Sequence, residues 1–349
     1  MGPGIKPPQE RGVDDVVSDR YVKPLQDRPS LEEETLDEKQ IPTIDLAAIE
    51  GGRRDRIVAE IAHACEDWGF FHIINHGVPL ELIDKLKENA NKFFRLPYEE
   101  KKLYAVEPGK RTIGYGAGNR TDVSEVDVLD WRESMSHKCR PLAERYNAEW
   151  PTNPEGCSET ISEYADRLRE VAVKLLEVIS ESLGLPSSFL EEFCGGEKAT
   201  QLVMMNFYPS CPSPTMTLGF NSHSDIGTIT LLLQDEVGGL QIRKDGCWLK
   251  VSPVPGAFTV NLGDQTQVIT NGKYKSVEHR VVVNASKPRL SVATFYNPSP
   301  ETTIRPAELF VNREHPAAYR SYSFGDYLAF CYAKGPSSKD HLQYVAINN

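Results

Sequence analysis

Two side chains that bind metals stand two residues apart in NSHSDIGTITLL, where His223 and Asp225 precede a run of strand-forming residues. Because side chains alternate along an extended chain, residues at i and i+2 point to the same side. His279 stands at the start of another predicted strand, in KSVEHRVVVN. Two imidazoles and one carboxylate form the facial triad that binds Fe(II) and leaves positions open for a chelating 2-oxo acid and dioxygen. The sequence therefore predicts an iron site at His223, Asp225 and His279.

The histidine and aspartate pattern alone allows other interpretations. A histidine two residues before an aspartate is common, and the usual reason is a turn that the aspartate caps. Two histidines and one aspartate also suit zinc, which would indicate a hydrolase. The zinc alternative supplies no obvious general base, and it leaves the polar pair described next without a role.

An anion-binding pair follows ten residues after His279. Arg289 and Ser291 in PRLSVATF are two residues apart, so on a strand they face the same way. A planar guanidinium and a hydroxyl suit the distal carboxylate of a five-carbon diacid. In NFYPSCP, Tyr208 can add its hydroxyl to the same carboxylate, and Asn206 shares its face. The structural alternative is an arginine paired with a distant Asp or Glu.

The overall charge disfavours some classes of partner. A net charge of −11 over 349 residues argues against a nucleic-acid-binding surface, which needs a basic face, and against anionic membranes. No apolar run approaches the roughly 18 residues of a membrane span, and no secretory signal is visible. The seven cysteines include no close CxxC pair, which indicates reduced thiols. We expect a cytoplasmic monomer that acts on a small molecule.

The elements that must position these side chains divide the chain into four segments. Residues 1–40 are predicted to form a loosely packed N-terminal arm, and 41–200 a mainly helical region. Residues 201–300 contain short strand-forming runs, such as QLVMMNFY and AFTVNLG, separated by turn signals. Residues 301–349 form a C-terminal segment. This order predicts a mixed α+β fold in which helices support a β-sandwich or barrel.

Within these segments the expected elements are as follows. Amphipathic helices are predicted at 53–68, 80–95 and 161–183, and a further helix at 323–334. The segment from Ala105 to Pro151 is rich in Gly, Asp and Arg and is predicted to be a loop.

Taken together, the motifs resemble those of plant-type Fe(II)- and 2-oxoglutarate-dependent dioxygenases. This group includes flavonol, anthocyanidin and flavone synthases, gibberellin oxidases and jasmonate hydroxylases. The resemblance runs from IPTIDL to about Lys334, through WGFFHIINHGV, NFYPSCP, HSDIGTITLLLQD, GGLQI, VNLGDQTQVITNGKYKSVEHRV and RLS. It implies a double-stranded β-helix (jelly-roll) core with iron between its two sheets.

The resemblance also implies cofactors and a reaction. Fe(II) would be bound by His223, Asp225 and His279, and 2-oxoglutarate by Arg289 and Ser291. Tyr208 and Asn206 would complete the 2-oxoglutarate site. Dioxygen would be the second co-substrate, and 2-oxoglutarate would be decarboxylated to succinate while the organic substrate is hydroxylated or desaturated. Ascorbate would be the reductant that restores oxidised iron.

The substrate is predicted from three positions. Phe295 stands where flavonoid-oxidising relatives place a phenylalanine against the substrate's aromatic ring, and core packing is the alternative role. Ser134 and Ser136 stand where those relatives have a tyrosine and a phenylalanine. We therefore predict a roomier, more polar wall and a flavonoid substrate, such as a flavanone converted to a flavone or hydroxyflavanone.

Two alternatives to a flavonoid oxidase remain. The segments DRYVKPLQDRP and DGCWLKVSPVPGAFTVNLGDQ resemble jasmonate hydroxylases, so a jasmonate- or gibberellin-type hormone is the alternative substrate. A non-catalytic binding protein with the same β-helix is the alternative from another class. The intact triad together with Arg289 argues against it, because a binding protein would be free to lose them.

Overall fold

The computed structural model describes residues 7–8, 17–29, 40–107, 113–118, 128–145, 147–334 and 340–347. The helices are α1 (Arg54–His63), α2 (Leu80–Phe94), α3 (Tyr98–Lys101), α4 (Cys157–Ser182), α5 (Phe189–Phe193), α6 (Asp264–Ile269), α7 (Phe324–Lys334) and α8 (Asp340–Gln343). The strands are β1 (Thr43–Asp45), β2 (Phe70–Ile74), β3 (Tyr115–Ala117), β4 (Glu133–Arg140), β5 (Thr200–Tyr208), β6 (Phe220–His223), β7 (Ile229–Gln234), β8 (Leu240–Lys244), β9 (Cys247–Lys250), β10 (Phe258–Leu262), β11 (His279–Val281), β12 (Arg289–Asn297), β13 (Thr303–Ile304) and β14 (Tyr322–Ser323). Among these described helices, none has the length and apolar character needed to cross a bilayer.

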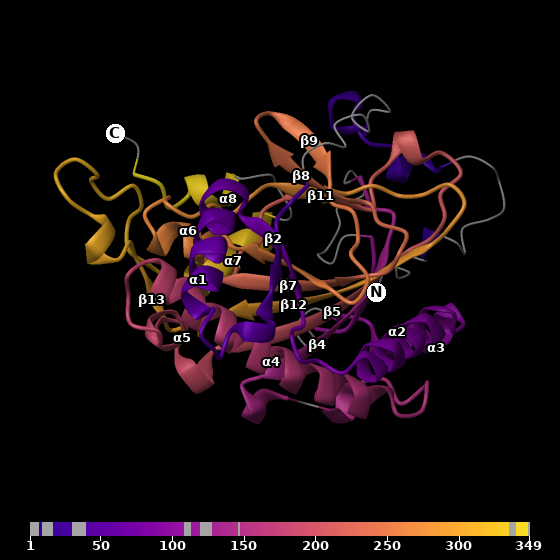
Figure 1. The fold of residues 1–349 in the computed structure, drawn as a ribbon. Coiled ribbons are helices and arrows are strands. Elements are labelled where there is room, and N and C mark those ends of the chain that lie inside the picture. The colour runs from indigo at the N-terminus through magenta and orange to yellow at the C-terminus, as the bar shows by residue number, and fades with distance from the viewer. Residues whose placement is uncertain are drawn as a thin grey trace.

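Two sheets make up the β core (Figure 1). The large sheet has eight strands in the order β1-β2-β10-β7-β12-β5-β4-β3, and the small sheet has four in the order β6-β11-β8-β9. From β6 to β12 the chain passes repeatedly from one sheet to the other, so strands that follow each other in sequence often lie in opposite sheets. This alternation is the predicted double-stranded β-helix, and the mixed α+β fold is confirmed.

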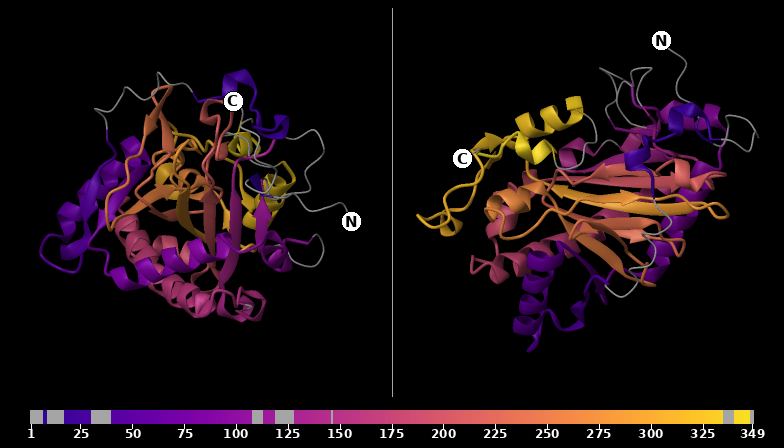
Figure 2. Two further views of the ribbon diagram at one scale, coloured as in Figure 1. Left: turned by 90° about the vertical axis from the view of Figure 1, so that its right-hand side faces the viewer. Right: turned by 90° about the horizontal axis from the view of Figure 1, so that it is seen from above.

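Helices cover the outer face of the large sheet, while the small sheet lies on its other side (Figures 1 and 2). The long helix α4 packs against α1 and α2 and against β5, β7 and β12. Strand β12 shows how the two faces differ. Leu290, Val292 and Tyr296 belong to the core shared with the helices, whereas Ser291 and Phe295 line a cavity between the sheets. The period of two therefore sends β12 residues alternately to the core and to the cavity.

The predicted loop from 105 to 151 is wrong for part of its length. Strand β4 pairs with β5 along its whole length, and β3 pairs with β4 at the edge of the large sheet. The polar composition concealed this strand, because its charged groups are satisfied internally. Lys101 lies 2.6 Å from Glu133, and both side chains are buried. With both faces of β4 covered, no alternation of polar and apolar residues marks it as a strand.

The prediction of a loosely packed arm is wrong for residues 17–23, in which Val17, Tyr21 and Lys23 are buried. Tyr21 packs edge-on against Trp131, with ring centroids 5.1 Å apart. The Nζ atom of Lys23 lies 2.9 Å from Asp130 Oδ1, and both side chains are almost completely buried. A buried ion pair is costly to break from one side, because the remaining charge loses its partner. This part of the arm is therefore fixed to the residues that lead into β4.

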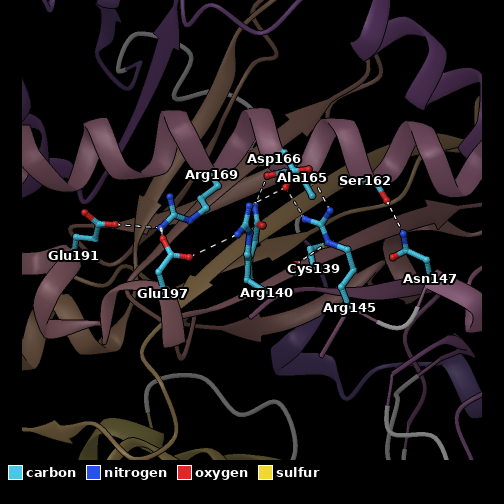
Figure 3. Close-up of polar contacts among 11 residues, drawn as sticks. Cys139, Arg140, Arg145, Asn147, Ser162, Ala165, Asp166, Arg169, Glu191 and Glu197 are labelled. Atoms are coloured by element: carbon cyan, nitrogen blue, oxygen red, sulfur yellow. Dashed lines mark hydrogen bonds and ion pairs between the residues drawn. The ribbon is translucent and has the colours of Figure 1, made fainter. Parts of the chain in front are cut away.

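Ionic contacts fix the other end of β4 to α4 on the helix-covered side of the sheet (Figure 3). Arg140 and Arg145 both donate to Oδ1 of Asp166, at 3.0 and 2.6 Å. Arg145 also donates to the backbone oxygen of Cys139 at 2.9 Å. Strand β4 is thus held at both ends, which fixes the residues that precede it relative to the sheet.

His137, in the middle of β4, gives this region a pH dependence. Its ring is fully buried and packs edge-on against Trp150 at 4.9 Å. Burial lowers the pKa of His137 to about 3, from an ordinary value of 6.5. The unfolded chain therefore binds a proton on this residue between about pH 6.5 and 3, while the folded chain does not. The free energy of unfolding is therefore not reduced by His137 above pH 6.5, and it decreases as the pH falls from 6.5 towards 3.

We predict that His137→Leu will flatten the loss of stability in acid. Between pH 7.5 and pH 5 the wild type should lose about 2 kcal/mol more than the variant, since each pH unit below the unfolded pKa costs about 1.4 kcal/mol. Urea unfolding of both proteins at the two pH values measures this difference. Equal losses would mean that His137 takes up its proton in the folded protein over the same pH range as in the unfolded chain, so that its pKa is not lowered by folding.

Candidate active site

The three predicted metal ligands come together between the two sheets. His279 on β11 lies opposite His223 on β6 in the antiparallel register of the small sheet, and their ring centroids are 4.2 Å apart. Asp225 follows β6, and its Oδ1 atom lies 3.7 Å from the Nε2 atoms of both histidines. The three ligand atoms all lie within 4.8 Å of one another. This spacing suits three ligands on one side of a single metal ion.

Hydrogen bonds orient each of these side chains for ligation. The Nδ1 atoms of His223 and His279 lie 2.7 and 3.0 Å from the backbone oxygens of Asn221 and Val277. A carbonyl oxygen can only accept, so Nδ1 carries the proton in both rings and Nε2 presents a lone pair. Such contacts fix the tautomer and direction of ligating histidines in metalloproteins.

Asp225 is held from the opposite sheet. Its Oδ2 atom accepts hydrogen bonds from Thr230 on β7 at 2.5 Å and from Asn261 on β10 at 2.7 Å. Both donors belong to the large sheet, whereas the two histidines belong to the small one. The Oδ1 atom of Asp225 remains directed at the histidines, and the triad links the two sheets.

The electrostatics of the triad favour a cation. Burial, followed by the nearby His279, lowers the pKa of His223 to about 3. Burial opposes the ionisation of Asp225, but His279, His223 and the hydrogen bonds from Asn261 and Thr230 outweigh it and lower the pKa of Asp225. At neutral pH the site therefore contains a carboxylate and a neutral His223. A buried carboxylate needs a positive partner, which a metal ion supplies.

The predicted anion site lies next to the triad. Arg289 on β12 is opposite Tyr208 on β5, and Ser291 is opposite Asn206. All four residues line one small cavity together with the triad. The guanidinium lies 5.0 Å from the Tyr208 ring centroid. Its NH1 atom donates to the Ser291 hydroxyl at 3.1 Å, so the predicted pair is in contact.

Arg289 is a buried cation without a direct ion-pair partner among the described residues, although the carboxyl group of Asp235 is near enough to feel its charge. It is 2% exposed, and it forms no ion pair with a carboxylate of the described residues. Its NH2 atom donates to Gln234 Oε1 at 2.9 Å, and Nε is buried without a partner. The amide of Gln234 is held in turn, because its Nε2 donates to Thr259 at 3.2 Å. A fixed guanidinium with a spare donor fits a carboxylate ligand.

A second, larger cavity adjoins the triad on its other side. Its volume is about 180 Å³, and Phe295 and Met204 line both it and the smaller cavity. Its wall is mainly apolar, with Leu202 and Ile226 in addition, and Cys331 and Tyr332 of α7 close one side. The two cavities meet at His223 and Asp225. The site can therefore hold a small dicarboxylate and an apolar molecule on either side of one metal ion.

The three predicted substrate residues occupy different places. Phe295 is half-buried and lines both cavities. Ser134 and Ser136 pair with Asn206 and Met204, so they stand on the cavity face of the sheet. Both serines are nearly inaccessible, neither lines either of the two cavities beside the triad, and their hydroxyls have no hydrogen-bond partner among the described residues. Of the three, Phe295 is the one that lines the two cavities beside the triad.

Several side chains that contact the triad and Arg289 or line the cavities were not predicted from the sequence. Thr230, Asn261 and Gln234 support the triad and Arg289 from strands that read as plain apolar runs. Arg132 lines the larger cavity and donates to Asn206 Oδ1 at 3.0 Å. Arg132 could have been found from the sequence, because residues 132, 134 and 136 point to the same side of an extended chain and the two serines were already substrate candidates.

Profiles of known families match most of the region that builds this site. The 2OG-Fe(II) oxygenase superfamily matches residues 199–298. The N-terminal domain described as "non-haem dioxygenase in morphine synthesis" matches residues 41–153.

Similar proteins cover nearly the whole chain. DMR6-LIKE OXYGENASE 2 of Arabidopsis thaliana is 44% identical over 90% of both chains. Flavanone 3-dioxygenase 2 of Oryza sativa subsp. japonica is 39% identical over 90% of both. The crystal structure of JOX2 in complex with 2OG, Fe and JA superposes with a TM-score of 0.90 at 38% identity, covering 99% of each chain.

Proposed function

We propose that the organic substrate of this protein is a flavanone. The chain belongs to the 2OG-Fe(II) oxygenase superfamily and is a 2-oxoglutarate-dependent dioxygenase. The observation that carries this proposal is the position of Phe295. Its ring lines the larger, mainly apolar cavity and also the smaller cavity beside the triad. An aromatic ring there can stack on a flat aromatic substrate. The similarity to flavanone 3-dioxygenases supports the same choice.

The residues of this chain would each make a distinct contribution. We propose that Nε2 of His223 and His279 and Oδ1 of Asp225 hold Fe(II), and that Arg289 and Ser291 hold the distal carboxylate of 2-oxoglutarate. Bound iron with its co-substrate supplies the power to remove hydrogen from an unactivated carbon. The apolar wall excludes water and orients the carbon to be oxidised.

The reaction balances in either of two forms. Hydroxylation would convert flavanone, 2-oxoglutarate and O₂ to hydroxyflavanone, succinate and CO₂. Desaturation would convert the same reactants to flavone, succinate, CO₂ and water. In both, O₂ is the oxidant and 2-oxoglutarate supplies two of the four electrons. We propose ascorbate as the reductant that keeps iron in the ferrous state.

Jasmonate is the second candidate, and one observation favours it. The structure with a TM-score of 0.90 over 99% of both chains is that of JOX2 in complex with JA. Jasmonate is aliphatic, so it would gain contact area from Phe295 but no ring stacking. The two candidates therefore differ in how strongly they depend on this ring.

The test is the ratio of oxidised product to succinate in wild type and Phe295→Ala. With a flavanone, the variant should lose about 0.5–1.5 kcal/mol of stacking beyond the lost area. The target carbon would then be misplaced, so succinate should form without matching product. With jasmonate the ratio should change less. The assays contain Fe(II), 2-oxoglutarate and ascorbate.

A matched control removes a phenylalanine that does not touch the cavities. Phe207 on β5 stacks on Phe94 at 5.4 Å and lines neither cavity, so Phe207→Ala should lower stability without changing the ratio. Wild type that couples tightly with jasmonate and turns over no flavanone would overturn the proposed substrate.

A further inference from the structure

Arg132 is a buried cation to which the proposed iron and 2-oxoglutarate sites assign no role of its own, although it contacts Asn206 of the latter. It is 2% exposed and immediately precedes β4. The guanidinium carbon lies 3.5 Å from the ring centroid of Phe220, and NH1 donates to Asn206 at 3.0 Å. Its Nε atom is buried without a partner, and no carboxylate of the described residues pairs with it. A buried guanidinium in this state still lacks an acceptor for its Nε–H and an anion to balance its charge.

The position of Arg132 points to a ligand as that acceptor. Among the described residues, it is the only lysine or arginine that lines the larger cavity. The guanidinium of Arg132 stacks on the ring of Phe220. The Phe220 ring centroid lies 4.0 Å from the ring centroid of His223, a predicted iron ligand. The cation is therefore near the reaction centre, in a cavity whose other walls are mainly apolar.

The backbone around Arg132 is held in advance of binding. Asp130 accepts from Lys23 at 2.9 Å and from the backbone N–H of Asn221 at 3.2 Å. The indole of Trp131 donates to the backbone oxygen of Pro209 at 3.1 Å. Three separate segments thus fix the residues on its N-terminal side. A cation held in this way loses little freedom when it binds a ligand.

We propose that Arg132 is a specificity-determining residue that anchors the organic substrate through an oxygen acceptor at one end of an otherwise apolar molecule. The acceptor is a carbonyl or a carboxylate, since both present lone pairs to a guanidinium. This inference rests on the proposed function for assigning the larger cavity to the substrate. It holds for a flavanone, through its ring carbonyl, and for jasmonate, through its carboxylate.

The experiment compares pairs of ligands that differ in the acceptor. One pair is a flavanone and the corresponding flavan, which lacks the carbonyl, and the other is jasmonate and its methyl ester. Binding to the full-length protein, loaded anaerobically with Fe(II) and 2-oxoglutarate, is measured for wild type, Arg132→Met and Arg132→Lys. In the pair that binds, wild type should prefer the member with the stronger acceptor by roughly 10- to 100-fold. Arg132→Met should abolish this preference, and Arg132→Lys should restore part of it.

Two controls separate anchoring from a structural role. Arg145→Met removes another largely buried arginine near β4, on the helix-covered side, and should leave the preference intact. The KM for 2-oxoglutarate checks that loss of the contact with Asn206 has not disturbed the neighbouring site. An equal loss of affinity for both members of a pair in Arg132→Met would overturn the proposal, as would failure of wild type to bind either acceptor-bearing compound. A preference seen only with the jasmonate pair would refute the flavanone substrate and support the anchor.

Discussion

Asp225→Ala should reduce the turnover of 2-oxoglutarate to background while leaving the fold in place. Asp225 is the only carboxylate in the triad, and its Oδ1 atom faces both histidines at 3.7 Å. Loss of a residue that merely supports a ligand costs about 10–100-fold in metal affinity, so loss of the ligand should cost at least about 100-fold. Fe(II) affinity is measured by anaerobic titration, and turnover by succinate formation.

Thr230→Val should have a smaller effect on the same metal site than Asp225→Ala. It keeps the carboxylate but removes one of the two donors to Oδ2, so its Fe(II) affinity should fall about 10–100-fold. The metal-free Asp225→Ala protein leaves Thr230 and Asn261 without their acceptor and should lose no more than about 6 kcal/mol of unfolding free energy, since each unsatisfied donor costs about 1–3 kcal/mol. Near-normal iron binding by Asp225→Ala would refute the metal assignment, and loss of folding would be visible as a separate effect in urea unfolding.

The sequence predicted the triad and the anion site because their chemistry depends on local periodicity. Arg289 and Ser291 are two residues apart, and so are His223 and Asp225, so an extended chain brings each pair together without knowledge of the fold. Their meeting with His279 depends on the register between β6 and β11. That register is a long-range property, so His279 was predicted as the third ligand from its residue type and from the resemblance to a known family, not from its distance to the other two.

Long-range packing also explains what the sequence did not reveal. Strand β4 resembles a loop in sequence because it contains charged side chains, such as Glu133, whose partners, such as Lys101, lie far away along the chain. The arm appears loose because its anchor, the ion pair of Lys23 with Asp130, spans more than a hundred positions. Ser134 and Ser136 were predicted to lie in a loop beside the substrate, whereas they lie on strand β4 and line neither of the two cavities beside the triad. The division into segments at residues 40, 200 and 300 stays a proposal, since β1 to β4 join the same sheet as β5.

Arg289→Lys should raise the KM for 2-oxoglutarate by roughly 30- to 1,000-fold, which corresponds to about 2–4 kcal/mol for a buried charged contact. The substitution keeps the positive charge, so it tests the planar fork. In the wild type the two terminal nitrogens contact Ser291 at 3.1 Å and Gln234 at 2.9 Å. A lysine ammonium cannot hold both contacts and also present two parallel donors to a carboxylate. At saturating 2-oxoglutarate, kcat should largely recover, because the predicted iron ligands are unchanged.

A matched co-substrate shows whether the lost contact is with the distal carboxylate. 2-Oxobutyrate keeps the 2-oxo acid that would chelate iron but lacks the second carboxylate. Wild type should strongly prefer 2-oxoglutarate, and in Arg289→Lys this preference should shrink by the same factor as the rise in KM. The measurement is kcat/KM for both co-substrates in both proteins. If the KM for 2-oxoglutarate is unchanged, Arg289 serves the structure through Gln234 and Tyr208, and the dicarboxylate binds elsewhere. If instead both co-substrates lose activity equally, the substitution has disturbed the triad, since only the distal carboxylate distinguishes the two molecules.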